Sequence, residues 1–119
     1  MSNKVAVIIE DEQNHAIIFS RILQVAGFET EIIQDGQVAI NRLETVAPRI
    51  IILDLHLPHV SGYEILRKIR ADQHLMGSYV IVVTADVYNK PQTLDQADLI
   101  LTKPIEIEEL HSLVVGLAS

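Results

Sequence analysis

Short apolar runs alternate with helical patterns along the whole chain, and this alternation restricts the fold more than any other feature. Five runs of strand length are rich in aliphatic, mostly β-branched residues, and they cover residues 4–9, 28–33, 50–53, 79–83 and 99–101. Between them, apolar residues recur at spacings of three and four, as in amphipathic helices. Strands that alternate with helices are joined by crossovers, which produce a parallel sheet. The sequence therefore predicts a doubly wound α/β domain with helices on both faces.

Length and composition agree with one domain that covers residues 1–119. The chain has no cysteine, which excludes disulfides, thiolate metal sites and cysteine nucleophiles. Its net charge of −7 argues against nucleic-acid binding, because phosphate neutralisation needs clustered Lys and Arg. No apolar run could span a bilayer, and the first residues do not follow the order of a signal peptide. We therefore expect a cytoplasmic domain that binds neither nucleic acid nor membrane.

Polar side chains follow four of the predicted strands. They are Glu10 and Asp11 after the first strand, Asp54 after the third, Thr84 after the fourth and Lys103 after the fifth. In doubly wound sheets, ligands bind outside the carboxyl ends of the strands. We therefore expect these five residues to converge on one edge of the sheet.

Three clustered carboxylates repel one another and raise each other's proton affinity. Mg²⁺ resolves this repulsion, since it takes carboxylate ligands and leaves positions for water and phosphate oxygens; Mn²⁺ is the alternative. Beside the metal and Lys103, the Asp54 carboxylate stays ionised and can act as a nucleophile. Lys103 and the Thr84 hydroxyl can then contact the oxygens of a transferred phosphoryl group.

Each of these residues also has an ordinary structural interpretation. A helix cap explains Asp11 or Glu12, a turn explains Asp54, strand propensity explains Thr84, and a solvated surface charge explains Lys103. The occurrence of all five at successive strand ends favours the phosphoryl-transfer site.

With these residues in place, the chain resembles the receiver domain of two-component response regulators. The likeness covers essentially the whole chain and rests on Ile-Glu-Asp-Glu at 9–12, Leu-Asp-Leu-His-Leu-Pro at 53–58, Ser-Gly at 61–62, Val-Thr-Ala at 83–85 and Lys-Pro at 103–104. The resemblance implies a flavodoxin-like fold with strand order 2-1-3-4-5. It also implies a phosphohistidine donor on a sensor histidine kinase or phosphotransfer domain, and allows a homodimer that forms on phosphorylation.

The resemblance assigns a role to each matching residue. Metal binding falls to Glu10, Asp11, Asp54 and the backbone carbonyl of His56, and phosphorylation to Asp54. Thr84 and Lys103 contact the phosphoryl group, and the peptide bond between Lys103 and Pro104 is cis. Receivers catalyse their own phosphorylation and autodephosphorylation, so the chain is predicted to be a signalling switch rather than a turnover enzyme.

The sequence departs from the family in two places. Ile100 stands three residues before Lys103, where an aromatic residue is usual, and an aliphatic side chain cannot repeat the aromatic in/out exchange. Our hypothesis is that Tyr88 takes over this role. The stretch between Thr84 and Lys103 is also short, which predicts a shortened or irregular fourth helix over residues 87–96. His56 and Asp86 are predicted to tune phosphoryl lifetime.

Four alternatives stay open at this stage. One is an interaction module of receiver shape that is not regulated by phosphorylation. Another is a phosphatase with an aspartate nucleophile, in which His56 would act as acid or base. A flavin carrier would share the fold, but the acidic residues after the first strand would repel its phosphate. His56 and His59 would suggest a different metal, such as zinc or iron.

Overall fold

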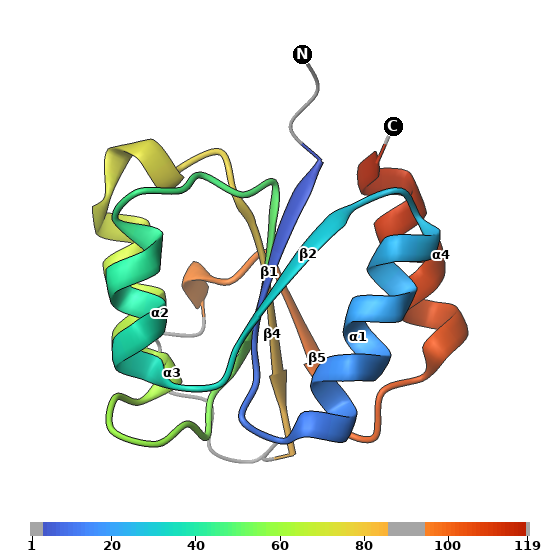
Figure 1. Ribbon diagram of the computed structural model, residues 1–119, viewed down its shortest axis with the longest axis horizontal. Helices are drawn as coiled ribbons and strands as arrows, with labels where there is room; N and C mark the ends of the chain where they lie inside the picture. The colour runs from blue at the N-terminus through green and yellow to red at the C-terminus, as the bar shows by residue number, and fades with distance from the viewer. Residues whose placement is uncertain (1–3, 86–94, 119) are drawn as a thin grey trace.

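One parallel sheet organises the part of the chain that the computed structural model describes, residues 4–85 and 95–118. Its strand order is β2-β1-β3-β4-β5, which confirms the predicted doubly wound fold (Figure 1). The strands are β1 Val5–Ile9, β2 Glu29–Ile33, β3 Ile50–Asp54, β4 Tyr79–Thr84 and β5 Leu99–Thr102. No strand bound differs from its prediction by more than one residue.

Helices cover both faces of the sheet (Figure 1). They are α1 Gln13–Val25, α2 Gly36–Leu43, α3 Gly62–Ala71 and α4 Ile107–Ala118, with a short 3-10 turn, η1 Gln73–Leu75. In Figure 1, α2 and α3 lie on one face, and α1 and α4 lie on the other. The predicted fourth helix over residues 87–96 lies, apart from its last two residues, outside the described part of the chain. Asp86 and Tyr88 lie outside it as well.

The central strands are buried on both sides, as their continuous apolar runs predict. Every residue of β3 is buried. Successive side chains of β1, β3 and β4 point to opposite faces of the sheet and pack into two separate hydrophobic cores. Toward α2 and α3 lie Val7, Ile9, Ile51, Leu53, Val80 and Val82. Toward α1 and α4 lie Ala6, Ile8, Ile50, Ile52, Ile81 and Val83. Burial of each Val, Ile or Leu side chain in these two sets contributes about 2 kcal/mol to folding.

Local signals begin and end the helices close to the strands. Glu12 caps α1, because its side-chain carboxylate accepts hydrogen bonds from the backbone amides of Asn14 and His15. Asp35 caps α2, and the hydroxyl of Ser61 accepts a hydrogen bond from the backbone amide of Glu64 at the start of α3. After α1, Gly27 adopts a φ of 99°, which glycine tolerates and other residues rarely adopt. The loops at the carboxyl edge that precede α1 and α2 are consequently short.

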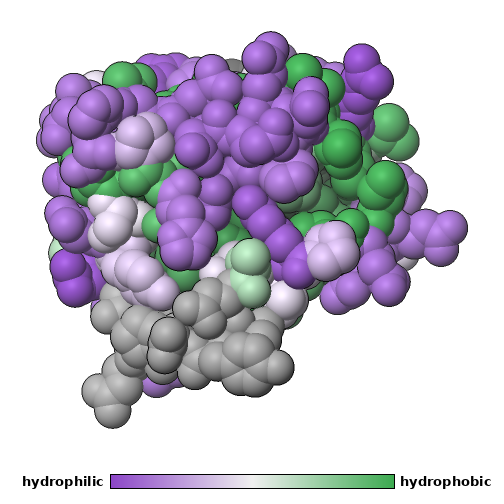
Figure 2. All heavy atoms as spheres, turned by 90° about the horizontal axis from the view of Figure 1, so that it is seen from below, coloured by the Kyte–Doolittle hydropathy of each residue, from purple (hydrophilic) through white to green (hydrophobic). Residues whose placement is uncertain are grey.

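The register brings the strand ends to one edge of the sheet. Leu53 pairs with Ile9 on one side and with Val82 on the other, and Asp54 pairs with Val83. Figure 2 views the molecule from this carboxyl edge, where hydrophilic side chains occupy much of the surface. None of the described helices is both long and apolar enough to cross a bilayer.

Candidate functional site

Three carboxylates meet at the carboxyl edge, as predicted. Glu10 and Asp11 follow β1 directly, and Asp54 is the last residue of β3. One oxygen of each carboxylate lies within 4.8 Å of the corresponding oxygens of the other two. Glu10 and Asp54 are only 0% and 3% exposed, whereas Asp11 is exposed. The cluster therefore has a buried floor of two carboxylates and a third at its rim.

The backbone after β3 fixes the Asp54 side chain. The amide of His56 donates to Oδ1 of Asp54 at 3.1 Å. The same loop packs closely on the start of α3, where a Cβ on Gly62 would lie 2.6 Å from the carbonyl oxygen of Asp54 and 2.5 Å from Cα of Leu55. Only glycine fits at this position without a shift of the backbone. The tight packing thus holds Asp54 in place.

Lys103 places an ammonium between the two buried carboxylates. Its Nζ lies 3.0 Å from Oε1 of Glu10 and 3.5 Å from Oδ2 of Asp54. Its backbone amide donates to the carbonyl of Thr84 at 2.8 Å, which joins it to the end of β4. The following peptide bond, to Pro104, is cis as the resemblance implies.

One cation does not balance this cluster. Burial first, and then the neighbouring Asp54, raise the pKa of Glu10 to about 8, although Lys103 acts in the opposite direction. Burial alone would lower the pKa of Lys103, but its interactions with Glu10 and Asp54 outweigh this effect and raise it. Among the described residues, no group donates a hydrogen bond to the buried Oε2 of Glu10, so this oxygen is unpartnered when Glu10 is ionised; only a protonated Glu10 can share a hydrogen bond with Asp54. Because such an oxygen is costly to bury and all the candidate ligands are oxygens, the residues fit a hard divalent cation.

The other predicted site residues lie nearby or further along the same sheet. Thr84 is buried at the end of β4, where it pairs with Thr102. The His56 side chain is exposed; the predicted metal contact of its carbonyl and its tuning role stay predictions. Ile100 is partly buried against the core beneath α2 and α3. The positions of Tyr88 and Asp86 fall outside the described residues.

The sequence interpretation gave no role in the site to His15. The ring is half exposed, but its Nδ1 lies 3.0 Å from Oε1 of Glu10. His15 also lines an apolar pocket of about 210 Å³ together with Phe19 and Lys103. The sequence signal that could have pointed to His15 is its position in the first turn of the helix that follows the acidic residues.

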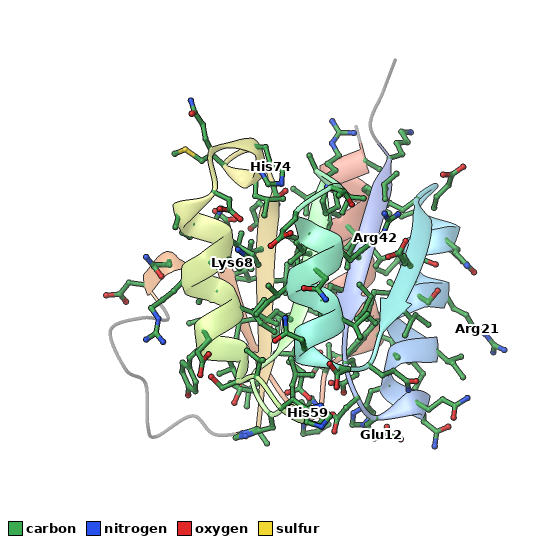
Figure 3. All side chains as sticks on the ribbon, turned by 60° about the vertical axis from the view of Figure 1, so that its left-hand side comes forward. Glu12, Arg21, Arg42, His59, Lys68 and His74 are labelled. Carbon is green, nitrogen blue, oxygen red and sulfur yellow. The ribbon has the colours of Figure 1, made fainter. Side chains whose placement is uncertain are left out.

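A second contact that the sequence did not reveal ties two loops of this edge together. Nδ1 of His59 contacts Oδ2 of Asp35, the residue that caps α2. His59 has a φ of 70°, and a Cβ on Gly36 would lie 2.5 Å from the carbonyl oxygen of Val60. In Figure 3, Glu12 and His59 lie at the carboxyl edge, whereas His74 lies at the opposite end. The contact links the loop after β3 to the loop after β2.

Known proteins resemble the chain over nearly all of its length. A family model, described as the response regulator receiver domain, matches residues 6–115. The response regulator ArlR of Staphylococcus haemolyticus is 38% identical over 109 residues, which are 89% of this chain and 48% of that protein. The transcriptional regulatory protein TrcR of Mycobacterium tuberculosis is 31% identical over 112 residues, or 93% and 44% of the two chains. The chain thus spans about half the length of these curated relatives.

Solved structures agree with this match. A CheY-like response regulator receiver domain from Methylobacillus flagellatus has a TM-score of 0.85 and 26% identity, over 98% of this chain and 99% of that chain. The response regulator TrrA of Thermotoga maritima, solved in complex with Mg²⁺ and BeF, has a TM-score of 0.84 and 26% identity, over 96% and 98%. Fold, carboxylate cluster and family match lead to one conclusion: the chain belongs to the response regulator receiver domains, which are phosphoacceptors in two-component signalling.

Proposed function

We propose that Asp54 is the residue that accepts the phosphoryl group, in a reaction that depends on a bound divalent cation. Glu10, Asp11, Asp54 and the backbone carbonyl of His56 would hold Mg²⁺, or Mn²⁺ in its place. The observation that carries this proposal is the cluster of three carboxylates within 4.8 Å of one another. Its buried and unpartnered Glu10 oxygen supports a cation at this place.

The chemistry follows from the charges around Asp54. An Asp54 oxygen attacks phosphorus, the bond from phosphorus to the donor nitrogen breaks, and that nitrogen leaves with the electron pair. The products are an acyl phosphate on Asp54 and a free histidine on the donor. When bound, the cation neutralises charge on the phosphoryl oxygens. Lys103, 3.5 Å from Oδ2 of Asp54, supplies a second positive charge, and the Thr84 hydroxyl donates to a phosphoryl oxygen.

The same residues account for two reactions that the chain would catalyse on itself. A small donor such as acetyl phosphate can replace phosphohistidine, because the positive charges act on the transferred group and not on the donor. Water can then attack the phosphorus of the acyl phosphate, which returns the Asp54 carboxylate and releases inorganic phosphate. Each phosphoryl group is thus held for a time and then lost, as in a switch.

The donor would be a phosphohistidine on a sensor histidine kinase or a phosphotransfer domain, and the location would be cytoplasmic. A homodimer that forms on phosphorylation is a further prediction from the resemblance. The control of phosphoryl lifetime by Asp86 and His56, and the switch role of Tyr88, stay hypotheses. Replacement of Tyr88 by alanine with unchanged output would contradict the last of these.

Incubation with Mg²⁺ and acetyl phosphate, followed by intact-mass measurement, tests the proposal. We expect the mass of one phosphoryl group to be added, and the addition to disappear in Asp54→Asn. A matched variant, Asp72→Asn, removes a carboxylate at the end of α3 and should be phosphorylated normally. Labelling of Asp54→Asn, or no labelling of the wild type, would contradict the assignment of Asp54.

A further inference from the structure

We propose that His15 is a positioning residue of the metal site. Together with Lys103, it holds Oε1 of Glu10 and so leaves Oε2 directed at the cation. This inference rests on the proposed function of the carboxylate cluster and adds a residue that is not itself a ligand.

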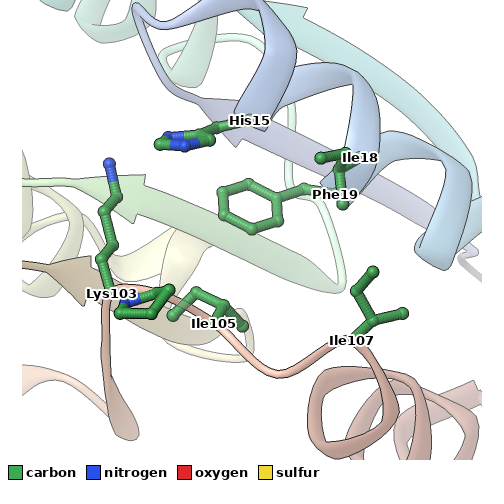
Figure 4. A pocket seen from close by; sticks show the side chains of 7 residues that line it. His15, Ile18, Phe19, Lys103, Ile105 and Ile107 are labelled. Atoms are coloured by element: carbon green, nitrogen blue, oxygen red, sulfur yellow. The ribbon is translucent and has the colours of Figure 1, made fainter.

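Two nitrogen atoms converge on the same carboxylate oxygen. Nδ1 of His15 and Nζ of Lys103 each lie 3.0 Å from Oε1 of Glu10. In Figure 4, the His15 ring projects from α1, and the Lys103 side chain projects from the segment after β5 toward the His15 ring. The other oxygen, Oε2, is buried and has no hydrogen-bond partner in the described chain. The two oxygens of the Glu10 carboxylate, which are chemically equivalent in an isolated side chain, therefore have different surroundings in the fold.

The imidazole is held in place by the start of α1. Oε2 of Glu12 accepts the backbone amide of His15 at 2.9 Å and lies 3.5 Å from its Nδ1. The Phe19 ring is one turn further along, with its centroid 6.4 Å from that of His15. His15 is the third residue after the cap, the position from which a side chain commonly reaches back over a helix start. Here it reaches past the cap to Glu10.

The role of His15 differs from that of Lys103. Lys103 is shared with Asp54, at 3.5 Å, and in the proposed reaction it also contacts the phosphoryl group. The terminal torsion of a glutamate is broad, so one shared donor leaves Glu10 free to exchange its two oxygens. His15, with the proton on Nδ1, gives Oε1 a second donor, and within the described chain this donor forms no hydrogen bond with Asp54. It therefore keeps Oε2 turned toward the cation while Lys103 changes partners.

Mn²⁺ affinity, followed by the electron paramagnetic resonance of the free ion, tests this role without phosphorylation. We expect about tenfold weaker binding in His15→Leu, since loss of a residue that orients a metal ligand usually costs 10- to 100-fold and Lys103 remains. In His15→Asn the amide nitrogen takes about the place of Nδ1, so affinity should return to near the wild-type value. His111→Leu, on α4, is the matched control and should bind normally. Thermal unfolding of each variant confirms that it is folded.

The outcomes separate this inference from the function on which it rests. Mn²⁺ binding by folded His15→Leu that equals or exceeds that of the wild type would overturn the positioning role. His15 would then either have no effect on the site or compete with the metal ion as a positive charge. Weak binding by both folded variants, Leu and Asn, would also overturn it, because ring packing and not the donor would be responsible. If the wild type is phosphorylated on Asp54 in these cases, the proposed function stands. A wild type that neither binds Mn²⁺ nor is phosphorylated would overturn both.

Discussion

Cation binding should release a proton from Glu10 near neutral pH. Burial and the neighbouring Asp54 raise the pKa of Glu10 from its ordinary 4.5 to about 8 in the metal-free protein. Between these pH values, the folded chain keeps Glu10 protonated while the unfolded chain holds it as the carboxylate. A metal ion binds the carboxylate only, so binding must displace the proton.

The direction of both effects follows from the raised pKa. The contribution of Glu10 to metal-free stability is fully present below pH 4.5 and is lost as the pH rises through about 8. Each pH unit inside this window lowers the free energy of unfolding by at most about 1.4 kcal/mol. Mg²⁺ affinity changes in the opposite direction: it should rise up to about tenfold per pH unit within the window and level off above it.

Urea unfolding in EDTA, at a series of pH values from 4.5 to above 8, measures the first effect. Calorimetric titration with Mg²⁺ over the same range measures the second. Glu10→Gln is the control, because an amide of the same shape does not titrate and the difference from wild type isolates Glu10. Calorimetry in two buffers of different ionisation enthalpy counts the protons released. The reasoning is refuted if that stability difference stays constant across the window, or if Mg²⁺ binding releases no proton at neutral pH.

Substitutions at three positions test other parts of the site. Lys103→Met should tighten Mg²⁺ binding severalfold, measured by calorimetry, because the carboxylate cluster loses its compensating positive charge, and it should slow labelling by acetyl phosphate, because the transferred phosphoryl group loses a cation. Weaker Mg²⁺ binding would contradict this. Gly62→Ala should lower the urea-derived free energy of unfolding by about 2 kcal/mol, since its Cβ meets the backbone of Asp54 and Leu55, and an unchanged value would argue against that close approach. Asp35→Ala should lower the thermal midpoint by a few degrees and Asp35→Asn by less, because asparagine also caps helices; equal losses would assign the effect to charge.

The elements could be predicted because their signals are local or periodic. The run 50–53 contains four aliphatic residues in succession, which indicates a strand covered on both faces, and β3 is buried throughout. Asp35 and Ser61 mark helix starts through side chains that accept backbone amides. The carboxylate cluster followed from topology, because parallel strands end at the same edge.

Contacts between distant side chains could not be read in this way. His15 contacts Glu10 because the connection between β1 and α1 is short. Only two residues lie between Glu10 and the start of α1, so the first helical turn lies over the Glu10 carboxylate. Arg70, at the end of α3, donates to the carbonyl of Gln96 and pairs with Asp98 at 2.6 Å. Its partners are 26 and 28 residues away, and no helical or strand period connects them.

Ile100 and Lys103 together indicate where a change at the site enters the rest of this chain. An aromatic residue with a polar tip can exchange between core and solvent, but Ile100 has no polar group, and its burial against the core beneath α2 and α3 favours the inner position alone. Lys103, in contrast, divides its ammonium between Glu10 and Asp54. In the proposed reaction, a phosphoryl group on Asp54 would bring new negative charge close to Lys103, and we expect the ammonium to shift toward it. Because the backbone amide of Lys103 donates a hydrogen bond to the carbonyl of Thr84, we expect such a shift to be felt first at the ends of β4 and β5.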